Sequence, residues 1–170
     1  MRAIFSRSSR ALPLLAACAA LALASVAHAG VVEVKYIEAD KYTDAGHGRA
    51  LEEVETGLTR HLQQLGQTQL PASRSLAIEI LDIDLAGEIR PWHRLWPDTR
   101  VMRGRVDWPR ISLRYTLREG DRVVSEGKED VADMSYLQRS QWRGIEEGSA
   151  LGYERRMLSD WFHERFGAAP

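Results

Sequence analysis

The sequence predicts an α+β protein, a two-layer sandwich in which two amphipathic helices pack on an antiparallel or mixed sheet of about four strands. Segments with apolar residues at every second position occur along the chain together with two segments in which apolar residues recur every three or four positions. The order strand, helix, strand, hairpin, helix places the helices mainly on one face of one sheet. The 170 residues, of which 44% are hydrophobic, are enough to bury a single core.

Three segments have the alternation of β-strands. Residues 31–37 alternate apolar with charged side chains, as expected for a strand with one buried face. Residues 76–85 are rich in Ile and Leu, and their alternation changes phase near Leu81, which predicts a β-bulge. Residues 111–117 alternate cleanly and are followed by a polar, glycine-containing turn and two valines, which predicts a hairpin.

Two segments have the spacing of amphipathic helices. In residues 50–65, leucines and a valine recur at steps of three and four, and three glutamates lie near the positive end of the helix dipole. Gly66 is expected to cap the C-terminus of this helix. Residues 150–166 carry a wide stripe of leucine, methionine and aromatic residues. His61 and His163, which lie in these helices, are expected to face solvent.

The N-terminus has the pattern of a secretory signal peptide over residues 1–29. Three arginines and no acid precede an Ala/Leu-rich run, and Ala27-His28-Ala29 provides the small residues that a signal peptidase reads. Cleavage before Gly30 would leave residues 30–170 as a single periplasmic domain without a transmembrane span. A second interpretation is a lipoprotein, because Leu15-Ala-Ala-Cys18 is similar to a lipobox. That processing would leave an apolar run behind the lipid and would make the Ala27-His28-Ala29 site a coincidence.

The composition of residues 30–170 excludes several classes of protein. Removal of the three leader arginines leaves 20 basic against 24 acidic residues, a formal charge of −4. This acidic balance and the exported location argue against a nucleic-acid partner. Because the single cysteine, Cys18, lies in the leader, the remainder has no disulfide, thiol nucleophile or cysteine-ligated zinc. No cofactor is indicated.

Five strings occur in a fixed order along the chain. They are Tyr42-Thr-Asp-Ala-Gly46, Leu81-Asp-Ile-Asp-Leu-Ala-Gly87, Asp107-Trp-Pro-Arg-Ile-Ser-Leu-Arg-Tyr-Thr-Leu117, Asp130-Val-Ala-Asp-Met-Ser-Tyr-Leu137 and Tyr153-Glu-Arg-Arg-Met-Leu-Ser-Asp-Trp-Phe162. In this combination the chain resembles an uncharacterised family of exported proteobacterial proteins, known only as a domain of unknown function. The resemblance covers nearly all of residues 31–166 and implies a Gram-negative, periplasmic protein with one domain. It implies no active site.

Residues 88–110 are the most unusual segment of the chain. An arginine fork beside a flat aromatic ring suits an anionic envelope ligand or a protein partner. The alternative is that the tryptophans close the edge of the core while the arginines neutralise acids elsewhere. The candidate binding residues are Arg90, Trp92, His93, Arg94, Trp96, Arg100, Arg103, Trp108 and Arg110.

Two functions from different classes follow. Because the sequence contains no signature of a common hydrolase or nucleotide-binding protein, the leading hypothesis is a non-catalytic binding or envelope-accessory module that uses residues 88–110. The alternative is a metal-assisted hydrolase in which Asp82, Asp84 and Asp107 hold the ion and His93 transfers protons. Asp82 and Asp84 are two residues apart and would share one face of a strand. The competing structural interpretation is that these aspartates cap turns and pair with arginines.

Overall fold

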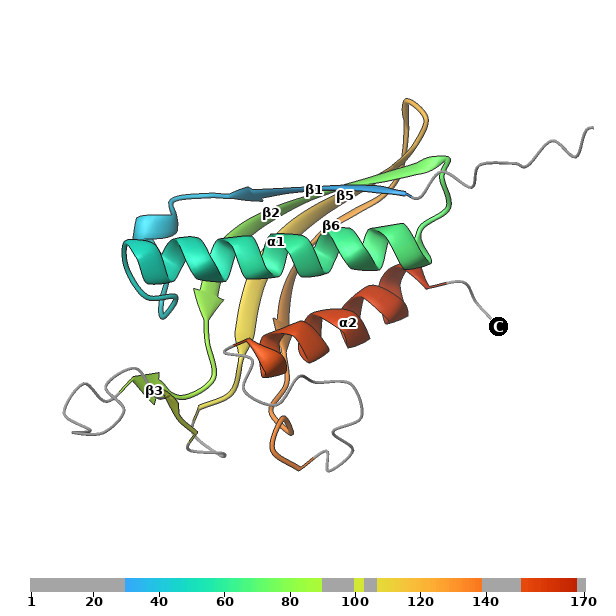
Figure 1. Ribbon diagram of the computed structural model, residues 1–170. Coiled ribbons are helices and arrows are strands. Elements are labelled where there is room, and N and C mark those ends of the chain that lie inside the picture. The colour runs from blue at the N-terminus through green and yellow to red at the C-terminus, as the bar shows by residue number, and fades with distance from the viewer. Residues whose placement is uncertain (1–29, 90–99, 103–106, 139–150, 168–170) are drawn as a thin grey trace, which may run out of the picture.

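The computed structural model describes residues 30–89, 100–102, 107–138 and 151–167, and confirms the α+β class (Figure 1). A four-stranded mixed sheet has the order β1-β2-β5-β6, and a two-stranded sheet pairs β3 with β4. The elements are β1 (Val31–Tyr36), the 3-10 helix η1 (Ala39–Lys41), α1 (Arg49–Gln69), β2 (Arg74–Asp84), β3 (Glu88–Ile89), β4 (Arg100–Val101), β5 (Arg110–Glu119), β6 (Arg122–Ala132) and α2 (Gly152–Phe166).

The pairing of the large sheet follows from the connections. β1 runs parallel to β2 because α1 crosses over between them, whereas the β2–β5 and β5–β6 pairs are antiparallel. The predicted bulge is confirmed, since the β2–β5 register shifts between Ile80 and Asp82. The bulge moves burial from Ile80 to Ile83, so Asp82 and Asp84 both lie on the outer face of the sheet.

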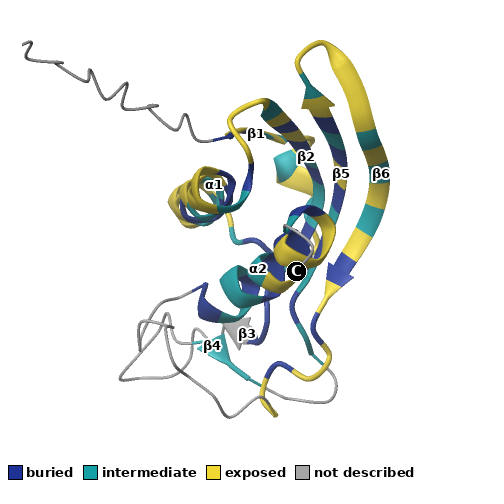
Figure 2. Cartoon of the chain, turned by 90° about the vertical axis from the view of Figure 1, so that its right-hand side faces the viewer, coloured by how far each residue is buried: buried dark blue, intermediate teal, exposed yellow. Residues whose placement is uncertain are grey.

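Both helices cover the same face of the sheet, and the core lies between the two layers (Figure 2). α1 packs against β1, and α2 packs against α1 and β6. Around Tyr115 of β5, the rings of Trp161 and Phe166 make edge-on contacts at centroid distances of 6.1 and 5.4 Å. Such contacts combine a large buried apolar area with a favourable ring geometry.

The expected cap at Gly66 is wrong. α1 continues to Gln69, and the N–H of Leu70 donates to the Gly66 carbonyl. Gly66 lies inside the helix, and Val32 of β1 packs directly on it. A Cβ at this position would overlap the valine Cγ2. Close packing between helix and strand, rather than chain termination, therefore accounts for this glycine.

Within the described ranges, no helix is long and apolar enough to cross a membrane.

Candidate functional site

Only part of the predicted binding segment can be placed. Residues 90–99 and 103–106 lie outside the described residues, so the predictions for Arg90, Trp92, His93, Arg94, Trp96 and Arg103 stay untested. Arg100, Trp108 and Arg110 are described. Trp108 is half-buried just before β5.

Arg100 fastens the small sheet to the end of β2. Its guanidinium pairs with both carboxylate oxygens of Asp44 at 3.1 and 3.2 Å, and donates to the Gly87 carbonyl at 2.9 Å. Only 12% of the side chain is exposed. Because its donors are used by the protein, Arg100 acts in this structure as an anchor between β4, β2 and the segment that precedes α1.

Of the three aspartates predicted to bind a metal, Asp82 and Asp84 bind other groups of the protein, and Asp107 lies near Asp84. Asp82 accepts hydrogen bonds from the backbone N–H and the hydroxyl of Thr43 at 2.7 and 2.8 Å. Asp84 pairs with Arg110 at 3.0 Å. Burial raises the pKa of Asp84, an effect opposed by Arg110 and reinforced by nearby carboxylates that include Asp107.

These contacts are those expected of strand-end aspartates that bind backbone and arginine. Among the described residues, no group of three His, Cys, Asp or Glu side chains is arranged to hold a metal ion. The metal-assisted hydrolase therefore stays a prediction without support from this geometry.

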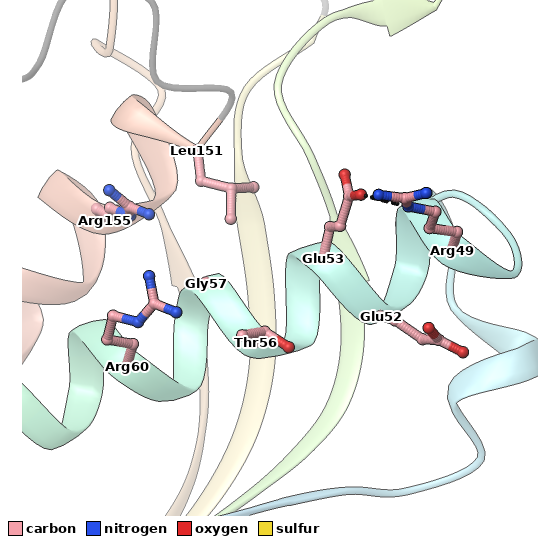
Figure 3. A pocket seen from close by; sticks show the side chains of 8 residues that line it. All are labelled: Arg49, Glu52, Glu53, Thr56, Gly57, Arg60, Leu151 and Arg155. Carbon is pink, nitrogen blue, oxygen red and sulfur yellow. Dashed lines mark hydrogen bonds and ion pairs between the residues drawn. The ribbon is translucent and has the colours of Figure 1, made fainter.

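A pocket of about 440 Å³ opens between α1 and the beginning of α2 (Figure 3). Arginine side chains from both helices line this pocket, and Gly57 and Leu151 lie at its base. The lining residues are Arg49, Glu52, Glu53, Thr56, Gly57, Arg60, Leu151 and Arg155.

Arg60 of α1 and Arg155 of α2 approach each other at one end of this pocket (Figure 3). Within the described part of the chain, neither guanidinium has a hydrogen bond or an ion pair, and Arg155 Nε is buried without an acceptor. Two neighbouring guanidinium groups that are not hydrogen-bonded to a carboxylate attract a carboxylate or phosphate, which accepts several N–H bonds at once.

Gly57 allows the two helices to approach closely at the pocket floor. A Cβ at this position would lie 2.7 Å from Leu151 Cδ1 and 3.6 Å from Arg155 Nη2. A glycine in a helix interior costs about 1 kcal/mol relative to alanine, so the close approach of Leu151 gives a structural reason for it.

His61 holds α2 beside α1, and the expectation that it faces solvent is wrong. Its Nε2 lies 2.8 Å from the Arg155 carbonyl and 2.9 Å from the Ser159 hydroxyl. Burial lowers the pKa of His61, and the charge of Arg155 lowers it further, against an opposing backbone hydrogen bond. His163 is exposed, as expected.

The opposite end of the pocket is acidic. Arg49 Nε pairs with Glu53 Oε1 at 2.9 Å, and both side chains are mostly exposed. Glu52, beside Glu53, is also exposed. The pocket therefore has at one end two arginines that form no ion pair with any residue the structure describes, and at the other end two carboxylates, one of which is paired with Arg49.

A second hollow, of about 280 Å³, lies between α2 and β6 and is rich in acids. Glu129 accepts hydrogen bonds from the Trp161 indole at 2.9 Å and from Arg165 at 3.2 Å. Asp133 pairs with Arg156 at 3.1 Å and accepts the backbone N–H of Ser135. These carboxylates connect β6 and the turn after it to α2.

Glu154 is a buried carboxylate at the beginning of α2, with 2% of its surface exposed. Its Oε1 accepts the N–H of Ala86 at 2.9 Å, whereas its buried Oε2 has no hydrogen-bond partner among the described residues. Burial raises the pKa of this carboxyl, while the Ala86 N–H and the charges of Arg100 and Arg155 act in the opposite direction. Glu154 thus joins α2 to the end of β2.

The sequence interpretation missed the pocket between the helices. Gly57 was a usable signal, because a glycine in the middle of a strong amphipathic helix marks a close approach of another chain segment. Arg60 and Arg155 carried no such signal, since charged residues on amphipathic helices ordinarily face solvent.

The fold and the pocket define a two-layer α+β protein with a basic site between its helices. The comparison with known families is consistent with the resemblance seen in the five strings. The chain belongs to the family described as Protein of unknown function (DUF3016), whose model matches residues 30–164. No curated protein and no solved structure matches the chain.

Proposed function

We propose that this chain is an exported, non-catalytic binding protein of the cell envelope, and that it holds an anionic ligand in the pocket between α1 and α2. The observation that carries the proposal is the approach of Arg60 and Arg155, two guanidinium groups that form no hydrogen bond or ion pair with an acid among the described residues. Export rests on the leader-like residues 1–29 and places the pocket in the periplasm.

The surroundings of the two arginines support a binding role. Arg100 and Arg110, which the sequence predicted to bind a ligand, are paired with Asp44 and Asp84, whereas Arg60 and Arg155 were not predicted from the sequence. Among the described residues, Arg60 and Arg155 have no ion-pair partner, and they line a pocket whose volume lies within the range of about 300–1,000 Å³ that is usual for small-ligand sites. An unpaired guanidinium in a pocket gains more from an incoming anion than one that must first release an aspartate.

The test is titration of the protein with inorganic phosphate, followed by amide chemical shifts at constant ionic strength. We expect saturable shifts at residues of α1 and α2 around the pocket. Arg60→Gln and Arg155→Gln should each weaken binding about tenfold or more, since a hydrogen bond to a charged group contributes about 1.5–3 kcal/mol.

The matched control is Arg122→Gln, because Arg122 pairs with Glu119 at the β5–β6 turn and does not line the pocket. Its affinity for phosphate should equal that of the wild type. Equal affinities for the wild type and the Arg60→Gln variant, or the absence of saturable shifts, would exclude the proposed site.

A further inference from the structure

We infer that the ligand of this pocket is a short peptide with free termini. The inference rests on the proposed function and specifies its substrate class. Its basis is that the two ends of the pocket differ in charge. Arg60 and Arg155 lie at one end, whereas Glu53, which pairs with Arg49, and Glu52 line the other end and together leave it with a net negative charge. A ligand that satisfies both ends is a zwitterion whose charges are separated by the length of the pocket.

The helical spacing sets that length. Glu53, Gly57 and Arg60 follow one another at steps of four and three, so they lie on one face of α1, the face that meets Leu151 and Arg155. Seven residues at a rise of 1.5 Å separate Glu53 from Arg60 by about 10 Å along the helix axis. An extended peptide spans at most about 3.3–3.6 Å per residue, so two or three residues match this distance.

The basic end suits a terminal carboxylate. Arg60 and Arg155 project from different helices, so one carboxylate could accept hydrogen bonds from both guanidinium groups. Between the two ends, Leu151 provides an apolar wall for a peptide side chain.

The acidic end suits a terminal ammonium group. Glu53 uses Oε1 for Arg49, and this pair is largely exposed, with 89% of the arginine and 68% of the glutamate side chain accessible. Exposed pairs of this kind contribute about 0–1 kcal/mol, so an ammonium group can share the carboxylate at little cost. The same carboxylates repel a second anionic group, which disfavours a dianion of equal length.

The experiment compares trialanine with two blocked forms, N-acetyl-trialanine and trialanine amide, by the same chemical-shift titration. We expect trialanine to bind about tenfold or more tightly than either blocked form. In Glu53→Gln, the preference for the free amino terminus should disappear while phosphate binding is retained or strengthened. In Arg60→Gln, the preference for the free carboxylate and the binding of phosphate should both weaken.

Glu126→Gln is the matched control, since Glu126 is an exposed glutamate on β6 and does not line the pocket. It should bind all three peptides as the wild type does. Equal binding of trialanine and N-acetyl-trialanine, or an unchanged preference in Glu53→Gln, would overturn the peptide inference and leave the anion site standing if phosphate still binds through Arg60. Failure of phosphate and trialanine alike would remove both proposals.

Discussion

The two hollows beside α2 differ in whether their charged side chains have hydrogen-bond partners within the described protein. In the acidic hollow against β6, Glu129 and Asp133 accept hydrogen bonds from Trp161 and Arg156, so these carboxylates hold the helix to the sheet. In the basic pocket against α1, Arg60 and Arg155 have no acceptor among the described residues. A concentration of charge therefore indicates a binding site only where the fold leaves that charge without a partner inside the protein.

We predict that the paired acids of the hollow between α2 and β6 stabilise the fold. Asp133→Ala removes a carboxylate whose side chain is 8% exposed and which pairs with Arg156, 17% exposed. We expect the free energy of unfolding to fall by about 3 kcal/mol, because the change removes a largely buried ion pair and the acceptor of the Ser135 N–H. Urea denaturation at pH 7 measures this change.

Glu164→Ala is the control in the same hollow, because Glu164 lines it but is exposed. Its effect should stay within about 0.5 kcal/mol. Phosphate affinity should be unchanged in both variants. An Asp133→Ala protein that is as stable as the wild type would contradict the structural role of the hollow between α2 and β6. A folded Asp133→Ala protein that no longer binds phosphate would contradict the assignment of binding to the other pocket.

The side chain of Glu154 combines both situations, because Oε1 accepts a hydrogen bond and the buried Oε2 has no hydrogen-bond partner among the described residues. Glu154→Ala should cost about 2 kcal/mol, the penalty for leaving the buried Ala86 N–H unsatisfied. Glu154→Gln keeps an acceptor for that N–H, so it should be more stable than Glu154→Ala. A Gln variant as unstable as the Ala variant would contradict this explanation.

The pH dependence of Glu154 has a definite sign. Because its pKa is raised in the folded protein, the folded state binds more protons than the unfolded state at pH values above the ordinary pKa of 4.5. The contribution of Glu154 to stability is therefore greatest at low pH and declines as the pH rises through the folded pKa. Glu154→Gln should remove this decline, which urea denaturation between pH 4 and 7 would detect.

Local patterns predicted much of the fold and little of the site. The period-2 and helical repeats, and the phase change at Leu81, record which side chains face the core, so they specified the elements and the bulge. The pairing of Arg100 with Asp44 joins residues 56 positions apart, and that of Arg110 with Asp84 joins residues 26 apart. Spacing along the chain does not reveal such partners, so it did not distinguish the anchoring arginines from Arg60 and Arg155, which have no ion-pair partner in the described ranges.

His61 provides the smallest expected effect, at the helix contact that supports the basic pocket. Burial and the charge of Arg155 lower its pKa below the ordinary value of 6.5, so the folded state binds fewer protons than the unfolded state as the pH falls through that value. The wild type should therefore lose stability from pH 7.5 to 5.5, and His61→Gln should lose less. His163→Gln, at an exposed position, should follow the wild type. Identical pH profiles for the wild type and His61→Gln in urea denaturation would show that burial and the charge of Arg155 do not oppose protonation of the His61 ring.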